Sequence, residues 1–377
     1  MANKTSQHVK LEDLLMGVVT PCYVLDLDKV RENIQLIRAS IPYSNFQIHY
    51  AMFSNDNERL LRLIKKEGLG VLVLNENEIE TAIKLGFSKE QIHLTGGTFT
   101  KERLVKLLSY GIDINLDSLA QLELVGQMAK CSEVGIRIRS YGKETKGAGE
   151  GISLQDLEKA KEIVDKYELR LVGIHTYVGT NILDEQKYFD ATKTLISISS
   201  QFSSLRYINI GGGFGIPYSS KERSFNWNAF GKEISRMFEQ IEGNKIQLKM
   251  EPGRSIVGDA GYFVTKVIEK RDENTLIVDA PYTNFARPFV YHTNHRVKCI
   301  RKKGEDKKFL IRGCTINSAD YLSSPHFDGD GAILPDIQAG DILYFKDVGA
   351  YSPVMQMDFL HNEKAPTLLM LNGEIKK

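Results

Sequence analysis

The segment Gln47-Ile-His-Tyr-Ala-Met-Phe-Ser-Asn55 is a largely apolar run that ends in small and polar residues. Such a run is typical of a strand that is buried on both faces and closes in a turn. Similar runs recur along the first two thirds of the chain. Together the eight runs lie at residues 47–52, 70–74, 92–95, 113–116, 134–139, 171–177, 206–210 and 247–251.

Amphipathic helical patterns separate these runs, as at 57–67, 76–85 and 154–167, and Ser153 is a candidate N-cap for the last. Alternation of this kind predicts a parallel sheet with helical crossovers. Eight repeats match a (β/α)8 barrel in length, and a doubly wound open sheet is the alternative that the pattern leaves open. In a barrel, functional groups gather at the C-terminal ends of the strands. Polar and Gly-rich residues do follow several runs, at 54–55, 96–97, 175–180, 211–215 and 251–254.

After Gly261 the pattern changes to short alternating runs separated by turn signals, which predicts an antiparallel sheet or a small β-barrel. These runs lie at 262–268, 275–279, 297–301, 308–312, 341–346 and 367–371. The run at 21–25 is a candidate to join them. We therefore predict two domains. A (β/α)8 barrel covers residues 28–260, and a β-rich domain of barrel or sandwich type is formed by residues 1–27 and 261–377.

The composition excludes several classes of function. The chain has 377 residues with a net charge of +1, so no bulk field attracts nucleic acid or an anionic membrane surface. It has no apolar run long enough to cross a membrane, and its first ten residues lack the apolar core of a signal peptide. We expect a cytoplasmic protein. The four cysteines and the isolated pair His292 and His295 predict neither a disulfide framework nor a metal site.

Three motifs carry candidate chemistry. The segment Ile208-Asn-Ile-Gly-Gly-Gly-Phe-Gly-Ile-Pro-Tyr218 offers glycine N–H groups to an anion, with a tight barrel turn as the alternative. Met250-Glu-Pro-Gly-Arg254 supplies a carboxylate and a guanidinium suited to phosphate, with a structural ion pair as the alternative. In Asp347-Val-Gly-Ala-Tyr351, the Tyr hydroxyl could donate to a phosphate, or the segment is only a turn.

Taken in chain order, the motifs TPCYVLD, YAMxSN, GIHTYVGT, GGGFG, EPGR, GCTINSADYL and GAY resemble the fold-III pyridoxal-phosphate decarboxylases, the family of ornithine and diaminopimelate decarboxylases. Within that family, GIHTYVGTNILD, GGGFGIPY and Phe359-Leu-His361 are most similar to the subgroup that acts in natural-product and carrier-protein pathways. The resemblance implies pyridoxal phosphate in the barrel mouth, an amino-acid-like substrate and an obligate homodimer.

The resemblance also assigns roles to single residues. Glu251 would pair with the pyridine nitrogen, and Tyr177 would take the place of a His that stacks on the ring. Arg287 matches an Arg that binds a substrate carboxylate in diaminopimelate decarboxylases, or it forms a salt bridge, and Asp320 is a second candidate for substrate contact. The loop at 313–322 would cross to the partner's pocket. The implied cofactor-binding residues are His175, Tyr177, Thr180, Gly211, Gly212, Gly213, Glu251, Gly253, Arg254 and Tyr351.

The chain departs from the family pattern at the reactive centre. Phe53 stands where the family has the Lys that carries the cofactor, and Phe can neither link to it nor move a proton. Ile316 stands at the catalytic Cys position, with Cys314 two residues earlier. Asn317 replaces an acidic residue that reads the substrate amine, and Leu72 replaces an Asp.

Two explanations of Phe53 are open: an engineered substitution, or native divergence. Native divergence leaves three outcomes. The chain binds pyridoxal phosphate noncovalently and is a carboxy-lyase of reduced or altered activity. Alternatively, its pocket takes a different anionic ligand. In the third case the chain is a non-catalytic binding or regulatory paralogue, a pseudoenzyme. The sequence favours a decarboxylase-like protein with noncovalent pyridoxal phosphate and no metal.

Overall fold

The computed structural model describes residues 11–139, 150–241, 246–302 and 304–376. The chain divides into two compact units. One unit, which we call the barrel unit, comprises residues 34–216 and 224–255. The other, the sheet unit, comprises the residues before 34, residues 217–223 and the residues from 256 onward.

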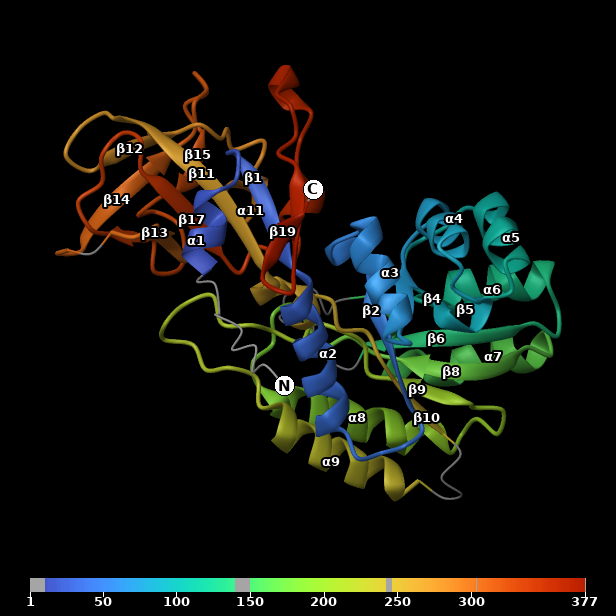
Figure 1. Ribbon diagram of the computed structural model, residues 1–377. Coiled ribbons are helices and arrows are strands. Elements are labelled where there is room, and N and C mark those ends of the chain that lie inside the picture. The colour runs from blue at the N-terminus through green and yellow to red at the C-terminus, as the bar shows by residue number, and fades with distance from the viewer. Residues whose placement is uncertain (1–10, 140–149, 242–245, 303, 377) are drawn as a thin grey trace, which may run out of the picture. The chain divides into compact units, whose positions relative to one another are not determined.

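Eight parallel strands form the barrel unit, and their pairing closes into a ring (Figure 1). The last strand pairs with the first, Met250 beside Ile48, and this closure excludes the open sheet. The predicted (β/α)8 barrel is therefore confirmed. The strands are β2 (Phe46–Ala51), β3 (Gly70–Val73), β4 (Ile92–Thr95), β5 (Asp113–Leu116), β6 (Glu133–Arg139), β8 (Arg170–His175), β9 (Tyr207–Asn209) and β10 (Gln247–Met250). A two-residue strand, β7 (Ile152–Ser153), pairs with β6 outside the ring.

Helices alternate with the strands and lie outside the ring (Figure 1). They are α2 (Leu27–Ser40), α3 (Glu58–Lys66), α4 (Glu76–Lys84), α5 (Lys101–Ser109), α6 (Leu119–Met128), α7 (Leu157–Lys166), α8 (Glu185–Ser199) and α9 (Trp227–Glu239). Side chains cap several of them, because the first N–H groups of a helix have no partner within it. Asn75 and Ser118, for example, accept from the backbone at α4 and α6. Ser153 caps the short 3-10 turn that precedes α7.

Polar side chains fill much of the barrel interior. The hydroxyl of Tyr207 donates to Asn115 Oδ1 at 2.9 Å, and Asn115 Nδ2 lies 2.6 Å from His93 Nε2. Lys249 Nζ lies 2.5 Å from Asp113 Oδ2 and 4.0 Å from the centre of the Tyr207 ring. These residues form a polar column inside the ring, below the loops that follow the strands.

The sheet unit contains a mixed sheet. Its strands are β1 (Cys22–Asp26), β11 (Gly261–Lys270), β12 (Thr275–Val278), β13 (Val297–Cys299), β14 (Lys307–Arg312), β15 (Tyr321–Ser323), β16 (Ala332–Leu334), β17 (Ile342–Lys346), β18 (Thr367–Leu371) and β19 (Glu374–Lys376), with helices α1 (Leu11–Met16) and α11 (Ala286–Tyr291). Most pairs are antiparallel, but β1 with β18 and β12 with β14 are parallel, so the prediction of an antiparallel sheet is wrong at these two pairs. Strand β1 lies between β11 and β18.

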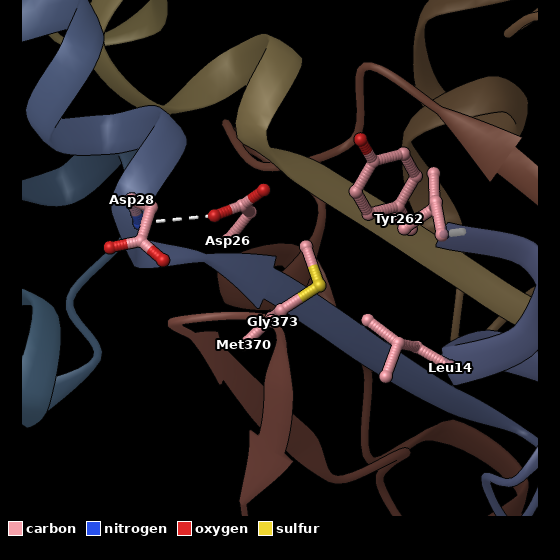
Figure 2. A pocket seen from close by; sticks show the side chains of 7 residues that line it. Leu14, Asp26, Asp28, Tyr262, Met370 and Gly373 are labelled. Carbon is pink, nitrogen blue, oxygen red and sulfur yellow. Dashed lines mark hydrogen bonds between the residues drawn. The ribbon is translucent and has the colours of Figure 1, made fainter. Parts of the chain in front are cut away.

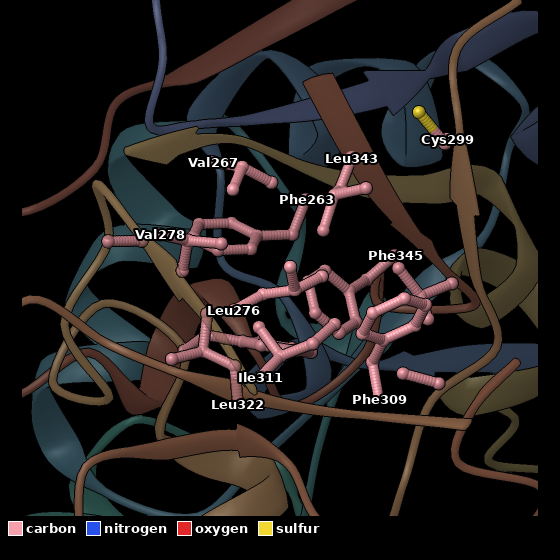
Figure 3. Packing of buried hydrophobic residues seen from close by; sticks show 14 of the residues in the cluster. Phe263, Val267, Leu276, Val278, Cys299, Phe309, Ile311, Leu322, Leu343 and Phe345 are labelled. Atoms are coloured by element: carbon pink, nitrogen blue, oxygen red, sulfur yellow. The ribbon is translucent and has the colours of Figure 1, made fainter. Parts of the chain in front are cut away.

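An aromatic and aliphatic core holds the sheet unit together (Figure 3). Phe263 of β11 stacks on Phe285 with ring centroids 5.0 Å apart, and Phe345 of β17 packs at the same distance from Phe285. A separate cavity of about 230 Å³ lies in this unit (Figure 2). Asp26 and Asp28 line it beside apolar side chains such as Met370.

Candidate functional site

A buried carboxylate, Glu251, lies at the end of the barrel where its strands finish. It follows β10 directly and is only 3% exposed. Its Oε1 accepts from Asn209 Nδ2 at 2.8 Å and from Thr95 Oγ1 at 3.1 Å, and its Oε2 lies 3.0 Å from His175 Nε2. These three donors end strands β9, β4 and β8, so the strand ends fix the orientation of the carboxylate.

This arrangement favours an ionised Glu251. Burial alone would raise the pKa of the Glu251 carboxyl, but the interaction with His175, its hydrogen bond and that of Asn209 outweigh burial and lower the pKa. Burial lowers the pKa of the His175 imidazole, and its Nε2 is the ring nitrogen that faces the carboxylate. A carboxylate has about four acceptor sites, and three donors leave room for one more. Glu251 can therefore accept from a ring N–H of a ligand.

The three glycines after β9 pack backbone against backbone. Gly211 and Gly213 have left-handed φ angles of +71° and +84°, and a Cβ on either would overlap a neighbouring carbonyl oxygen, that of Gly179 in the second case. A tight turn thus explains the glycines. It does not explain their donors, because the N–H groups of Gly212, Gly213 and Gly253 donate to no acceptor within the part of the chain that the structure describes. Unpaired backbone N–H groups of this kind suit an anion.

Tyr177 lies beside this loop. Its ring Cε2 is 3.3 Å from the position that a Cβ on Gly213 would take, and its hydroxyl is 3.0 Å from Thr180 Oγ1. The guanidinium of Arg137, from β6, lies 5.6 Å from the centre of the same ring. Arg254, which is buried, begins the short helix α10 (Arg254–Val257). The strand ends thus bring a flat ring, backbone donors and two guanidinium groups into one region.

Phe53 lies in a short 3-10 turn, η1 (Met52–Ser54), directly after β2. Gly253 fits against this turn, since a Cβ there would lie 2.9 Å from Ala51 Cβ and 2.9 Å from Ser54 Oγ. The turn therefore adjoins the loop that carries Glu251. Lys249 does not supply an amine here, because its ammonium bonds to Asp113 at the start of β5, the end of the barrel away from these loops.

In the sheet unit, Asp320 organises the loop that holds the other predicted catalytic residues. Its Oδ2 accepts from the Thr315 N–H at 2.9 Å and hydroxyl at 2.6 Å, and its Oδ1 accepts from Tyr282 N–H at 2.7 Å. These three hydrogen bonds let the buried carboxylate shape the loop, and a contact between Asp320 and substrate stays a prediction. Ile316 at the tip is fully exposed. Asn317 Nδ2 donates to the Tyr282 hydroxyl at 3.2 Å.

The remaining predicted residues of the sheet unit are Cys314, Arg287 and Tyr351. Cys314 is a free, exposed thiol. Arg287 is buried, with Nη1 2.5 Å from His295 Nε2 and its guanidinium 4.5 Å from the ring centre of Tyr218. Tyr351 has a left-handed φ of +58° and is half-buried.

Sequence reasoning missed three groups of the barrel site: Thr95, Asn209 and Arg137. Each is a polar residue at or near the end of a predicted strand, but that position alone does not distinguish these three from other polar residues of the chain. Among the described residues there is no group of three or more His, Cys, Asp or Glu side chains that could hold a metal ion.

The model of the family "Pyridoxal-dependent decarboxylase, pyridoxal binding domain" matches residues 27–258. The chain belongs to the pyridoxal-dependent decarboxylase family. It is 30% identical to the diaminopimelate decarboxylase of Methanothermobacter thermautotrophicus, over 94% of this chain and 88% of that protein. It is 29% identical to the enzyme of the same name from Buchnera aphidicola subsp. Acyrthosiphon pisum, over 97% of this chain and 92% of the relative.

Solved structures confirm the fold of this decarboxylase-family chain. Diaminopimelate decarboxylase from Helicobacter pylori, complexed with L-lysine, superposes with a TM-score of 0.85 at 24% identity, covering 97% of this chain and 95% of that one. Lysine/ornithine decarboxylase from Vibrio vulnificus, complexed with putrescine, gives a TM-score of 0.81 at 21% identity, covering 96% and 97%. No helix in the described ranges is long and apolar enough to cross a membrane.

Family membership implies pyridoxal phosphate, and the barrel unit fits this cofactor at two points. The unpaired N–H groups of Gly212, Gly213 and Gly253 suit its phosphate, and the ionised Glu251 suits its protonated ring nitrogen. The turn after β2 offers the side chain of Phe53 and no amine. The residues at the strand ends therefore fit the phosphate and the ring nitrogen of the cofactor.

Proposed function

We propose that the chain is an amino-acid decarboxylase-like protein that holds pyridoxal phosphate noncovalently at the C-terminal end of its barrel. Its substrate would be an amino acid or an amino-acid conjugate of a specialised biosynthetic pathway. One observation carries the proposal: an ionised, buried Glu251 lies beside a glycine loop with unpaired N–H groups. When bound, the cofactor supplies the electron sink that amino-acid decarboxylation needs.

Different barrel residues would then bind different parts of the cofactor. Glu251 would keep the ring nitrogen protonated, and Asn209, Thr95 and His175 would hold that carboxylate in place. The N–H groups of the glycine loop, with Arg254 and Thr180, would bind the phosphate. Tyr177 offers a ring face for stacking. Arg287, Asn317 and Tyr351 keep the roles that the family resemblance gives them, as predictions.

Phe53 sets the expected rate. At the position where the family has its Lys, no side chain can link the cofactor or move a proton at the reacting carbon. Ile316 at the Cys position likewise offers no proton. We therefore propose reduced or altered carboxy-lyase activity. These same two residues favour a second candidate, a non-catalytic binding or regulatory paralogue.

We also propose that the chain is a homodimer. Support comes from the loop at 313–322, which Asp320 holds in place by hydrogen bonds. Its tip residue, Ile316, is fully exposed, and an exposed apolar side chain of this kind suits a protein interface. Light scattering should give the mass of two chains, and Ile316→Asp should shift it toward one. A monomeric mass for the unaltered chain would contradict this part of the proposal.

Absorbance titration with pyridoxal phosphate tests the function. The chain should bind the cofactor and give the spectrum of free aldehyde, whereas Phe53→Lys should give the visible band of a Lys-linked cofactor. Phe53→Met, which has no amine, is the matched control and should give no such band. If neither the unaltered chain nor Phe53→Lys binds the cofactor, the proposal fails, and the barrel serves another anion or only the fold.

Release of CO2 from candidate amino acids separates the two candidate functions. Slow release by the unaltered chain supports the decarboxylase. Release only by Phe53→Lys supports the non-catalytic paralogue and also names the amino acid on which the active form works.

A further inference from the structure

Among the residues that the structure describes, the side chain of Arg137 has no partner that matches its charge. It lies on β6 and is half-buried, and it makes no hydrogen bond or ion pair with any residue whose position the structure gives. Its Nη1 lies 3.4 Å from the position that a Cβ on Gly96 would take, and its guanidinium faces the Tyr177 ring at 5.6 Å. A charged group that is taken out of water normally requires an ionic or hydrogen-bonded partner.

The neighbouring carboxylates do not supply that partner. Glu251 and Asp117 act on Arg137 electrostatically, and so does Glu150, but none of them forms an ion pair with it. The Glu251 oxygens already accept from three other side chains. Asp117 Oδ1 has itself no hydrogen-bond partner in the described part of the chain. Arg137 is thus a positive group at the barrel mouth that is available to an anion.

Tyr177 places Arg137 relative to the proposed phosphate site. One edge of the Tyr177 ring meets Gly213, and its hydroxyl meets Thr180. The Arg137 guanidinium approaches the same ring. Groups that bind anions therefore lie around one aromatic ring, which suits a ligand with a phosphate and a second anionic group.

We propose that Arg137 binds the carboxylate of the amino acid joined to pyridoxal phosphate in the barrel mouth. This inference rests on the proposed function and deepens it. A guanidinium gives two parallel N–H groups to a carboxylate, which a simple ammonium does not. Because the departing CO2 has no charge, this contact is stronger before decarboxylation than in its transition state. It would improve binding of the amino acid and slow its decarboxylation.

Two reduced, stable conjugates test the contact. N-(5′-phosphopyridoxyl)glycine has the carboxylate, and N-(5′-phosphopyridoxyl)methylamine lacks it but is otherwise the same. Titration calorimetry would compare both on the unaltered chain, on Arg137→Gln and on Arg170→Gln. Arg170 is the matched control. It begins β8, whereas His175 at the site ends that strand, so Arg170 lies at the opposite end of the barrel, where it pairs with Glu133.

Arg137→Gln should weaken binding of the glycine conjugate by about tenfold to a hundredfold, the range for loss of a charged hydrogen-bonded contact. Binding of the methylamine conjugate should change by less than about threefold, because it lacks the group that Arg137 contacts. Arg170→Gln should change neither. If the unaltered chain turns over an amino acid, Arg137→Gln should raise KM without lowering kcat.

Equal losses for both conjugates would overturn the inference, because Arg137 would then contact the pyridoxyl part or shape the mouth. No loss for either would overturn it as well. If Arg137→Gln does not fold by circular dichroism, Arg137→Lys takes its place, and the loss must again be specific to the glycine conjugate. Failure of the unaltered chain to bind pyridoxal phosphate would instead refute the proposed function, and this inference with it.

Discussion

Acid should destabilise this protein through two histidines inside its barrel. His49 and His93 are fully buried, and burial is the main cause that lowers the pKa of each imidazole. The pKa of His49 falls to about 3. Neither ring nitrogen of His49 has a hydrogen-bond partner among the residues that the structure describes. Protonating either ring inside the barrel is therefore unfavourable, whereas the unfolded chain protonates both near pH 6.5.

The sign and size follow from linkage. A depressed pKa in the folded state gives stability that is complete above the unfolded pKa and is lost as the pH falls toward the folded pKa. One unit below an unfolded pKa of about 6.5, each histidine costs about 1.4 kcal/mol, so His49 and His93 together cost about 2.8 kcal/mol at pH 5.5. The free energy of unfolding should thus be nearly constant above pH 7 and fall below it.

Urea denaturation of the cofactor-free protein from pH 7.5 to 5.5 measures this fall. His49→Leu should keep most of the stability at pH 7.5, because the ring makes no hydrogen bond to any described residue, and should remove about half of the acid-dependent loss. His326→Gln, which removes an exposed imidazole, should leave the pH dependence unchanged. A free energy of unfolding that stays constant down to pH 5.5 would refute the reasoning, since the two rings would then be protonated in the folded state or reached by water.

Three further substitutions test the barrel. Glu251→Gln should lower the free energy of unfolding by about 2–4 kcal/mol in urea denaturation, because the carboxylate accepts through both oxygens, whereas an amide accepts only through one oxygen. Unchanged stability would mean that the Glu251 carboxyl is already protonated. Gly213→Ala should weaken binding of pyridoxal phosphate at least about tenfold by absorbance titration, because a left-handed φ costs Ala about 1–2 kcal/mol and its Cβ would overlap the Gly179 carbonyl. An unchanged affinity would show that this loop does not bind the phosphate. Lys249→Met should cost about 1.5–3 kcal/mol in thermal or urea denaturation, since it removes a charged hydrogen bond and leaves Asp113 with the longer, 3.8 Å pairing to Arg206; a more stable variant would show that an apolar side chain serves this position better.

The barrel could be predicted because its information is local. A buried run followed by an amphipathic helix repeats eight times, and the order of the repeats is the order of the strands in the ring. The sheet unit lacks that regularity. Strands β15 and β16 have three residues each, too few for an alternating pattern to differ from a loop. The parallel pairing of Tyr23 in β1 with Thr367 in β18 joins residues far apart in the sequence, so no local pattern indicates it.

The candidate site was predictable where a motif marks it. Glu251 and the glycines stand in segments whose residue types have few other uses at a strand end. Thr95 and Asn209 carry no such mark, because a single polar residue in a buried strand looks the same whether it supports a carboxylate or faces solvent. Arg137 was missed for a different reason: its unusual feature is the lack of an ionic partner among the described residues, which only coordinates can show.

The need to keep Glu251 charged explains why the barrel interior is polar. A column of Tyr207, Asn115, His93 and Lys249 gives a barrel no stability that well-packed apolar side chains would not give, because each buried polar group must first lose its water. A buried ionised carboxylate changes this balance. It needs donors and positive charge nearby, and an apolar layer beneath it would raise its pKa toward the neutral form. The column ends at Asn209 and His93 beside Glu251, so it supports an acceptor that stays charged. Without a ligand that uses this charge, the same column would only reduce the stability of the barrel.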